Sequence, residues 1–370
     1  MTEFSVDGAP LQMERYPPVA DDPLQAWDAA DELLLQAHQL PEGPLWLFND
    51  HFGALACGLR QRQPSQILHW YSDSYVAHQG LEQNLALNEL APVSQAHQSL
   101  ETLASVAAPV GVLIKLPRSL RLLTWQLDWL NRQLPQGTPV VIAARQRDMP
   151  STLPDLTRQL LDQVHPSRAV KKARLVYGQL SGRQSGLDPV LSWHCEPLNQ
   201  TLHNYPNTYG SQKLDLGARL LLQHLPQNDG LVVDLGCGNG VLSVAMLQAN
   251  PDCQVLAVDE SQDALRACQD NTQAWSDRVE LLWNDCLSGV EGGSADLVLC
   301  NPPFHQQQAV TDHIAWQMFR DARRVLRSGG RLRIVGNRHL GYHIKLTRLF
   351  GGCKTLASNA KFVVLEAQKR

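Results

Sequence analysis

The chain has 370 residues, which exceeds the size of about 250 to 300 residues at which a single hydrophobic core stops growing, so its length predicts two domains. Hydrophobic residues make up 44% of the chain and charged residues 18%, a composition that excludes a disordered, collagen-like or disulfide-scaffold protein. The formal net charge of −4, taken alone, argues mildly against a nucleic-acid partner.

No apolar run approaches the roughly 18 to 20 residues that a membrane-spanning helix needs, and the first residues lack the basic and apolar regions of a signal peptide. The eight cysteines include no C-x-x-C pair, which favours a reducing cytoplasm over a disulfide framework. His194-Cys195-Glu196 matches the H-x-E of zinc deaminases but lacks their downstream P-C-x-x-C. We therefore expect a cytoplasmic protein with no membrane segment and no metal.

Charge is unevenly distributed along the chain. Residues 1–50 carry ten acidic side chains and one basic one, whereas residues 311–370 carry thirteen basic side chains and three acidic ones. A second basic cluster lies near the middle of the chain and comprises Arg168, Lys171, Lys172 and Arg174. Both basic regions suit a partner that carries phosphate groups. A simpler interpretation is that four of these arginines form one solvent-exposed helix face and bind nothing; they are Arg320, Arg323, Arg324 and Arg327.

The order of predicted elements is the same in both halves of the chain. Residues 177–210 contain glycine or proline at seven positions with little apolar periodicity, so they are typical of loops. We expect domains at residues 1–185 and 209–370, joined by a linker at 186–208. Each half begins with a helix, continues with an apolar strand and a turn, and then alternates strands with helices. This order predicts an α/β fold of two tandem Rossmann-like domains, each a parallel sheet covered by helices.

Matching segments recur in the two halves at an offset of about 185 to 189 residues. Leu45–Asp50 corresponds to Leu231–Gly236, and Val112–Pro117 corresponds to Val298–Pro303. We interpret this recurrence as an internal duplication.

The first copy lacks the chemistry of the second. Residues 50–54 (D-H-F-G-A) stand where residues 236–240 (G-C-G-N-G) form a glycine-rich turn. The other replacements put Tyr71 or Asp73 in the place of Asp259, and Lys115 in the place of Asn301. The first domain is therefore predicted to be a degenerate copy that has lost its site.

The glycine-rich turn of the second half follows the apolar strand of residues 231–235. The carboxyl end of a first strand is where open α/β sheets bind ligands, and the turn there comprises Gly236, Cys237, Gly238, Asn239 and Gly240. Val241 stands where a dinucleotide-binding G-x-G-x-x-G motif requires glycine, which disfavours a dehydrogenase. The carboxylate of Asp234 would repel a pyrophosphate and attract an ammonium group, directly or through water.

Acidic residues follow the next two predicted strands. Residues 254–258 lead into Asp259, whose carboxylate can accept both hydroxyl groups of a ribose. Residues 279–283 lead into Asn284-Asp285, where a short side chain could accept the exocyclic amine of adenine. Each acid alone would be an ordinary cap or turn residue. Together with Asp234 they occur at successive strand ends, which predicts a nucleoside-binding edge.

The fourth strand of the second half runs into Asn301-Pro302-Pro303-Phe304. Two prolines fix the backbone and remove two amide donors, so that carbonyl acceptors dominate. Asn301 adds a side-chain acceptor, and Phe304 adds a flat face for stacking. This donor-poor corner suits a planar substrate with an NH₂ group, although an isolated N-P-P-F would be only a rigid turn.

Residues 209–367 resemble the class I S-adenosylmethionine-dependent methyltransferases. The D-L-G-C-G-N-G turn is similar to their first motif, Asp259 matches their ribose acid, Asp285 their adenine contact, and residues 301–304 their catalytic N-P-P-F/Y/W motif. The resemblance implies S-adenosyl-L-methionine as cofactor and a catalytic set of Asn301, Pro302, Pro303 and Phe304. The implied cofactor-binding set is Asp234, Gly236, Cys237, Gly238, Gly240, Asp259, Asp285 and Asn301.

More narrowly, N-P-P-F-H and residues 214–222 resemble the bacterial ribosomal RNA guanine-N2 methyltransferases, which pair a degenerate N-terminal domain with a functional C-terminal one. Residues 23–32 and the total length are closest to the members that act on the large subunit. The resemblance covers essentially the whole chain, except that Tyr209-Gly210 stands where relatives carry Phe-Ser. It implies 23S ribosomal RNA as partner, either naked or in an assembly intermediate, and a monomeric protein whose first domain recognises RNA or is structural.

Several alternatives remain open from the sequence. The same N-P-P-aromatic corner serves enzymes that methylate adenine N6 or a protein glutamine amide, and the target could instead be the small-subunit 16S RNA. A nucleotide-binding oxidoreductase is disfavoured by the glycine spacing. A non-enzymatic RNA-binding or assembly factor is disfavoured by the intact second set of motifs.

Overall fold

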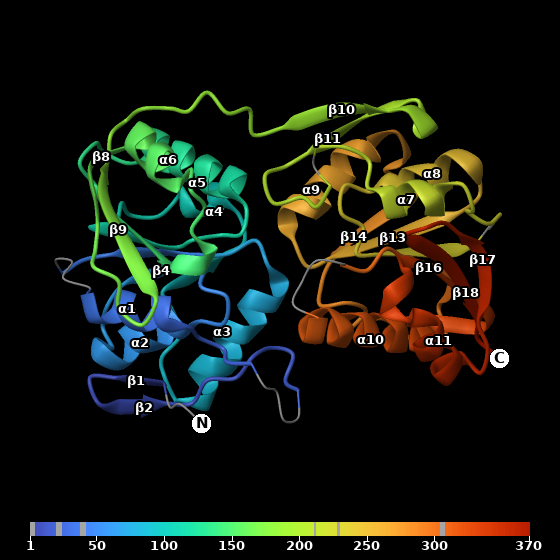
Figure 1. The fold of residues 1–370 in the computed structure, drawn as a ribbon, viewed down its shortest axis with the longest axis horizontal. Coiled ribbons are helices and arrows are strands. Elements are labelled where there is room, and N and C mark those ends of the chain that lie inside the picture. The colour runs from blue at the N-terminus through green and yellow to red at the C-terminus, as the bar shows by residue number, and fades with distance from the viewer. Residues whose placement is uncertain (1–3, 20–23, 38–41, 211, 228–229, 304–307) are drawn as a thin grey trace. The chain divides into compact units, whose positions relative to one another are not determined.

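The structure, a computed structural model, describes residues 4–19, 24–37, 42–210, 212–227, 230–303 and 308–370. The chain divides into two compact units, residues 1–189 and 190–370 (Figure 1). No helix in these described ranges is both long and apolar enough to cross a membrane.

The first unit contains a seven-stranded sheet with helices on both faces. Its elements in chain order are β1 (Phe4–Val6), β2 (Ala9–Leu11), α1 (Ala29–Ala37), β3 (Leu45–Phe48), α2 (Ala54–Arg62), β4 (Leu68–Tyr71), α3 (Tyr75–Leu87), β5 (Gln95–His97), α4 (Leu100–Leu103), β6 (Gly111–Lys115), α5 (Leu120–Gln133), β7 (Pro139–Arg145), α6 (Leu153–Leu160), β8 (Leu161–Pro166) and β9 (Ala173–Leu180). The strand order is β5-β4-β3-β6-β7-β9-β8. Strands β3 to β7 are parallel, and β9 runs antiparallel to both of its neighbours.

The second unit repeats this sheet, and each unit has a separate two-stranded antiparallel hairpin before its sheet, β1–β2 in the first and β10–β11 in the second. Its elements are β10 (Leu191–Cys195), β11 (Gln200–Asn204), α7 (Leu216–Leu222), β12 (Leu231–Leu235), α8 (Val241–Ala249), β13 (Gln254–Asp259), α9 (Gln262–Asn271), β14 (Val279–Trp283), β15 (Ala295–Cys300), α10 (Gln308–Val325), β16 (Leu326–Asn337), α11 (Tyr342–Phe350), β17 (Lys354–Ser358) and β18 (Phe362–Gln368). The strand order β14-β13-β12-β15-β16-β18-β17 matches that of the first unit strand for strand. The predicted α/β class with two Rossmann-like domains is therefore confirmed.

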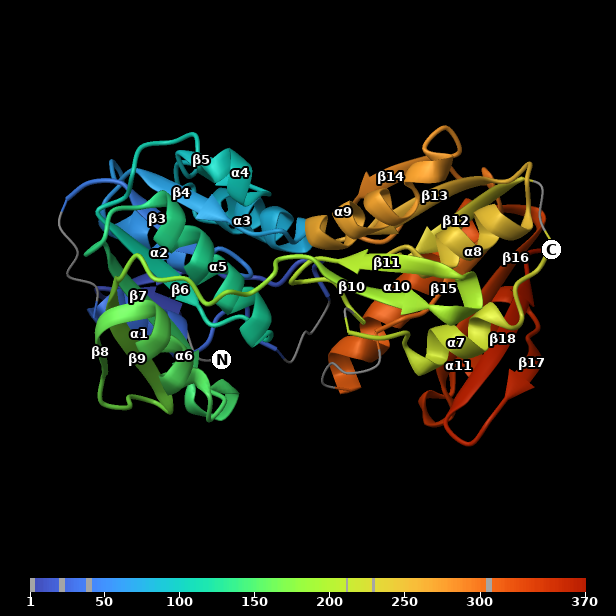
Figure 2. The same ribbon diagram turned by 90° about the horizontal axis from the view of Figure 1, so that it is seen from above.

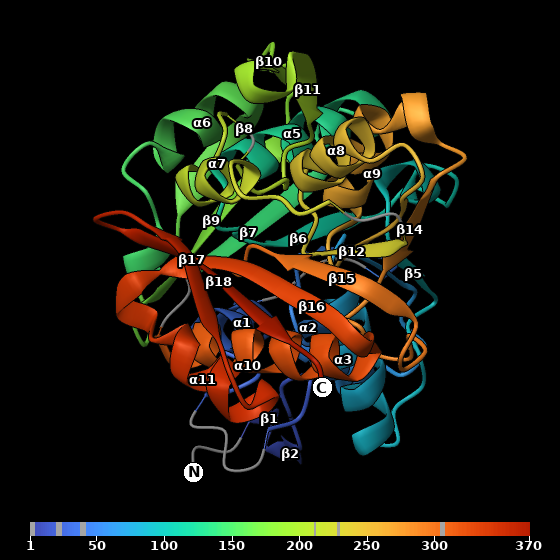
Figure 3. The same ribbon diagram turned by 90° about the vertical axis from the view of Figure 1, so that its right-hand side faces the viewer.

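Each of the two faces of the second unit's seven-stranded sheet has its own hydrophobic core. Leu221 of α7 and Val244 of α8 belong to one core, while Phe319 of α10 and Leu346 of α11 belong to the other. Figure 3 shows the sheet between these two helix layers. Central strand β12 is buried on both faces and is therefore almost wholly apolar, with Asp234 as its one acidic residue.

The expected linker at residues 186–208 is a β-hairpin over most of its length. Strands β10 and β11 pair antiparallel within the second unit, as Figure 2 shows. Asn271 of α9 holds the hairpin, because its side chain accepts from His203 N at 2.7 Å and donates to His203 O at 2.9 Å. This segment is thus a fixed part of the second unit, whose boundary falls after Pro189.

The arginine run of the C-terminal region does not form one helix face. Helix α10 ends at Val325, so Arg327 lies in strand β16, where it pairs with Asp296. Arg324 donates to the backbone carbonyls of Val290 and Leu287.

Candidate active site

The glycine turn between β12 and α8 has the backbone that its sequence predicts. Gly236, Gly238 and Gly240 have φ values of 74°, 54° and 76°, in the left-handed region that favours glycine. A Cβ on Gly240 would lie 2.6 Å from Cys268 Sγ, so this glycine allows α8 to approach α9. The amides of Gly236 and Cys237 donate to Val258 O at 2.8 and 3.0 Å, which fixes the turn against β13.

Asn239, the polar residue of this turn, anchors it to the hairpin. Its Nδ2 donates to Asn204 Oδ1 at 3.0 Å, and its carbonyl accepts from Asn271 Nδ2 at 2.8 Å. All three asparagines are buried. The sequence contained the three residues but no periodic signal that linked them, so this support of the turn could not be foreseen.

Asp234 lies beneath the glycine turn and is 1% exposed. Its Oδ2 accepts from Ser243 N at 3.0 Å and from Ser243 Oγ at 2.6 Å, which ties α8 to β12. Its Oδ1 is buried without a hydrogen-bond partner among the described residues. Burial, with a smaller contribution from the nearby charge of Asp259, raises the pKa of Asp234 to about 6 against the effect of the Ser243 hydrogen bonds.

Asp259 and Asp285 stand at the ends of the next two strands, as expected. Asp259 Oδ2 accepts from Gly238 N at 2.9 Å and Oδ1 from Ser261 N at 3.0 Å, so this half-buried carboxylate joins the turn to the start of α9. Asp285 is buried and accepts from Gln317 Nε2 of α10 at 2.8 Å.

Asn301 follows β15 directly and is half-buried. Its Nδ2 donates to Asp215 Oδ2 at 3.3 Å, whereas its Oδ1 is buried without a hydrogen-bond partner in the part of the chain that the structure describes. Pro302 is buried and Pro303 is half-buried. Phe304 lies outside the described residues.

These side chains gather at one edge of the sheet, because β14, β13, β12 and β15 are neighbours and run parallel. Two residues at this edge were not predicted. Asp215 caps α7 and contacts Asn301, and Asn337 ends β16 with its buried Oδ1 unpartnered among the described residues. Asp215 belongs to the stretch of residues 214–222 that carries the family resemblance, but nothing in that stretch linked it to Asn301, and Asn337 belongs to no motif.

The chemistry of the edge fits S-adenosylmethionine. Carboxylates and amide oxygens make it acceptor-rich, and three of its acceptor atoms, on Asp234, Asn301 and Asn337, are buried without a partner among the described residues. Such atoms are costly unless a donor reaches them. A cation with an ammonium group, ribose hydroxyls and an adenine amine supplies donors of the required kind. No group of three or more metal-ligating side chains occurs within the described ranges.

The equivalent edge of the first unit carries different residues. Gly53 and Gly240 each precede the second helix with φ values of 77° and 76°, which aligns the halves at an offset of 187 in this turn. Asn49, and not Asp50, therefore corresponds to Gly236. Strand pairing likewise puts Ser72 in the place of Asp259, so the expectation of Tyr71 or Asp73 is wrong.

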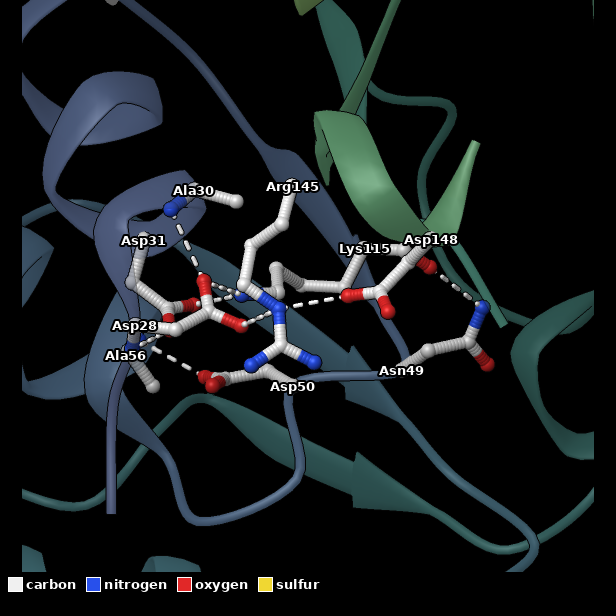
Figure 4. A network of polar contacts seen from close by, with 9 residues as sticks. All are labelled: Asp28, Ala30, Asp31, Asn49, Asp50, Ala56, Lys115, Arg145 and Asp148. Carbon is white, nitrogen blue, oxygen red and sulfur yellow. Dashed lines mark hydrogen bonds and ion pairs between the residues drawn. The ribbon is translucent and has the colours of Figure 1, made fainter. Parts of the chain in front are cut away.

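A buried ion cluster fills that edge (Figure 4). Lys115, at the position of Asn301, lies 2.7 Å from Asp31 Oδ1 and 3.0 Å from Asp28 Oδ1. Burial raises the pKa of Asp31, whereas Lys115 lowers the pKa of Asp28 although burial opposes it. Asp50 accepts from Ala56 N at 3.0 Å, and burial raises its pKa to about 6. The first unit thus has a cation where the second presents an acceptor.

Comparisons with known proteins cover the whole chain. Residues 1–182 match the family described as RLMG N-terminal domain, and residues 199–366 match the methyltransferase small domain. A protein of Magnetococcus marinus named ribosomal RNA large subunit methyltransferase G is 60% identical over 371 residues, with 100% of both chains covered. A protein of the same name from Vibrio vulnificus is 44% identical over 383 residues, also with 100% of both chains covered.

A solved structure has the same fold over the full length. It is the T. thermophilus 16S rRNA N2 G1207 methyltransferase (RsmC) in complex with AdoMet and guanosine, with 22% identity, a TM-score of 0.77, and coverage of 100% of this chain and 98% of that one. At this identity the likeness concerns the fold alone. The full-length sequence identities show more: this chain belongs to the family of the ribosomal RNA large subunit methyltransferases G.

Proposed function

We propose that this protein transfers a methyl group from S-adenosylmethionine to the N2 amino group of a guanine in 23S ribosomal RNA of the large subunit. One observation carries the choice of an amine as acceptor group. The buried Oδ1 of Asn301 has no partner among the described residues, and it belongs to a corner where two prolines have removed backbone donors. Such a corner favours a substrate that donates hydrogen bonds.

The carboxylates of the edge would hold the cofactor. Asp259 would accept the ribose hydroxyls, Asp285 the adenine amine, and Asp234 the ammonium group, directly or through water. When bound, the cofactor supplies an electrophilic methyl group on a sulfonium centre. The backbone of Gly236, Cys237, Gly238 and Gly240 allows close approach because three of these residues lack a Cβ.

The chain's contribution to the reaction is to orient the amine. The lone pair of the guanine amine is delocalised into the ring, which makes the nitrogen a poor nucleophile. If Asn301 Oδ1 and the Pro302 carbonyl accept its two hydrogens, the nitrogen moves toward tetrahedral geometry with its lone pair aligned for transfer. The methylated nitrogen is acidic and can release its proton without a strong base. Phe304 would stack on the extruded base.

Names of relatives support the choice of substrate. The relatives with full coverage are named for the ribosomal RNA large subunit, and the solved T. thermophilus enzyme is named for N2 of a guanine and holds guanosine. These names favour guanine N2 over adenine N6 or a protein glutamine amide, and the large subunit over the 16S RNA.

We assign the first unit a role in RNA recognition or in structural support. Its basic cluster lies at the turn between β8 and β9, where Arg168 and Lys172 are exposed and Lys171 pairs with Glu32 at 2.6 Å. Lys171 is exposed as well, and a phosphate-bearing partner could contact these cations. A monomeric, cytoplasmic protein without a metal completes the proposal.

The product nucleoside tests this function. Purified protein would be incubated with methyl-labelled S-adenosylmethionine and, separately, with deproteinised 23S RNA, deproteinised 16S RNA and intact large subunits. The RNA would be digested to nucleosides and analysed by mass spectrometry. We expect N2-methylguanosine from 23S RNA. The amount of label incorporated into deproteinised 23S RNA, compared with the amount incorporated into intact large subunits, identifies the preferred form of the substrate. Label on adenine, on a ribose or on protein would overturn the proposal, and label on 16S RNA alone would reassign the subunit.

A further inference from the structure

Asp215 joins the start of helix α7 to the corner that holds Asn301. It caps α7, because its Oδ2 accepts from Ala218 N at 2.9 Å. The same oxygen accepts from Asn301 Nδ2 at 3.3 Å, across 86 residues of sequence. Leu214, Ala218 and Leu221 are buried in the core of the second unit, so the cap is fixed to the body of the unit.

The carboxylate decides which end of the Asn301 amide faces it. An amide has a donor end and an acceptor end, whereas a carboxylate can only accept. Asp215 can therefore contact only the NH₂ end, and the carbonyl end is turned away from it. The atom turned away is Oδ1, which is buried and unpartnered among the described residues.

Tyr209 contacts the other oxygen of this carboxylate. Its hydroxyl lies 3.5 Å from Asp215 Oδ1, on the oxygen that does not contact Asn301. Partial burial, with the charge of Asp215, raises the pKa of Tyr209 to about 12, so its hydroxyl keeps its proton at neutral pH and can donate.

The first unit has an equivalent contact, between Asp28 and Lys115, but the lysine has no acceptor atom in place of Asn301 Oδ1. Asp28 precedes α1 and accepts from Ala30 N at 2.8 Å, as Asp215 does in α7. Its Oδ1 lies 3.0 Å from Lys115 Nζ, at the position of Asn301 (Figure 4). An ammonium group has three donors and no acceptor. The contact between cap and strand end thus recurs in both units, but only in the second unit does it leave an oxygen without a partner.

We propose that Asp215 is a positioning residue that holds the Asn301 amide in the orientation that presents Oδ1 to the substrate amine. This inference rests on the proposed function of Asn301 and adds the group that orients it. Asp215 itself touches neither substrate nor reacting atoms in this proposal.

The variant Asp215→Asn tests the orientation directly. Asparagine caps a helix as well as aspartate does, so α7 should persist. The new amide can donate to Asn301 Oδ1, which allows the Asn301 amide to turn over. We expect kcat to fall at least tenfold. The affinity for S-adenosylmethionine should stay within twofold of the wild-type value, and the thermal unfolding midpoint should stay within a few degrees of the wild-type midpoint. Asp28→Asn is the matched control, since it changes the equivalent cap in the first unit, and its kcat should stay within twofold.

An exchange of the two groups distinguishes positioning from capping. Asn301→Asp alone brings two carboxylates together and should lower kcat at least a hundredfold. The double variant D215N/N301D restores a donor opposite an acceptor, and its second carboxylate oxygen can face the substrate amine. We expect the double variant to turn over at least tenfold faster than Asn301→Asp alone. A role limited to capping predicts no such rescue.

Two results would overturn the proposal: a kcat of Asp215→Asn within twofold of wild type, or a double variant no faster than Asn301→Asp. If Asp215→Asn fails to fold, Asp215→Ser keeps a cap without an amide, and its kcat should also fall at least tenfold. These outcomes are separate from those of the proposed function. A wild-type product other than N2-methylguanosine rejects the guanine assignment. The effect of position 215 on position 301 can still be measured in that case, with whichever amine the wild-type protein methylates.

Discussion

Lys115 Nζ lies 2.7 Å from Asp31 Oδ1, and the two side chains are only 9% and 6% exposed. A buried ion pair of this kind is costly to form and more costly to break, because removal of one partner leaves an uncompensated charge. In the second unit the equivalent position carries Asn301, which is neutral and keeps an acceptor. The first unit thus carries an internal charge where the second has an amide whose oxygen is unpartnered among the described residues.

Lys115→Met should destabilise the first unit strongly. Asp28 and Asp31 lose the cation that both of them contact, and a cost of about 3–5 kcal/mol in unfolding free energy follows from breaking a buried pair. Denaturant unfolding, monitored by hydrogen exchange of the backbone amides in residues 1–189, would measure this loss of unfolding free energy. Lys171→Met is the control, since the Lys171–Glu32 pair has a lysine that is 66% exposed and should contribute less than about 1 kcal/mol.

The pH dependence of the Lys115→Met variant has a defined sign. Burial already raises the pKa of Asp31 in the folded protein, and loss of Lys115 removes an interaction that lowers it. An acid with a raised folded pKa favours the folded state when it is protonated, and this contribution is lost as pH rises through the folded pKa. The variant should therefore lose less stability in acid than at neutral pH. An equal or larger loss in acid would contradict this account.

One S-adenosylmethionine should bind per chain, in the second unit. Isothermal titration of the full-length protein should give a stoichiometry of one. Asp259→Ala should weaken binding by at least about 1.5 kcal/mol, because a charged acceptor is lost. Ser72→Ala changes the equivalent position of the first unit and should leave the affinity unchanged. A stoichiometry of two, or an effect of Ser72→Ala, would contradict the division between the units.

The fold could be predicted from the sequence because the strands of a doubly wound sheet are short apolar runs in a fixed alternation with helices. Glycine positions predicted the turn before α8, since only glycine adopts its backbone without strain. The acidic residues could be placed near strand ends because each lies within the last residues of an apolar strand or just after it. These features depend on local sequence, which is why they could be recognised without a structure.

The features that sequence reasoning missed depend on contacts between distant residues. The β10–β11 hairpin is held by two hydrogen bonds between the side-chain amide of Asn271 and the backbone of His203, and such bonds leave no hydrophobic periodicity in the sequence. The contact of Asp215 with Asn301 spans 86 residues. The correspondence of Ser72 with Asp259 follows from the register of the paired strands, and it has the same offset of 187 that aligns Gly53 with Gly240.

Cofactor affinity should depend on pH through Asp234. Burial raises its pKa to about 6, so the free protein holds this carboxyl partly protonated in mild acid. A cationic ligand favours the ionised form, so affinity should rise with pH and level off above about 6. At pH 5 the affinity should be up to about tenfold weaker than at pH 7. Titrations across this range would measure it, and Asp234→Asn should bind more weakly with little dependence between pH 5 and 7. A flat wild-type profile would remove Asp234 from the ammonium site.

RNA binding should weaken steeply with salt, because each phosphate contact releases counterions. Each contact contributes about −0.7 to −0.9 to the slope of the logarithm of the binding constant against the logarithm of the salt concentration. Arg320 and Arg323 are the exposed cations of α10 to test, since Arg324 is bonded to backbone carbonyls. Replacing both with Gln should reduce the slope by about 1.5. Arg158→Gln, in α6 and in neither basic cluster, serves as the control. An unchanged slope would return these two arginines to the simpler interpretation of a solvated helix face.

Asn301→Ala should separate catalysis from cofactor binding. The variant removes Oδ1, one of two acceptors assigned to the guanine amine, and this hydrogen bond should strengthen as the nitrogen becomes tetrahedral. Its loss should therefore lower kcat by about a hundredfold or more, the usual effect of removing one oriented transition-state hydrogen bond. The affinity for S-adenosylmethionine should stay near the wild-type value, since three carboxylates of the edge remain. Single-turnover rates with 23S RNA, measured beside cofactor titrations, would test both expectations. Near-normal turnover on the same nucleotide would remove Asn301 from the acceptor role, and a parallel loss of cofactor affinity would show that it acts through the cofactor site instead.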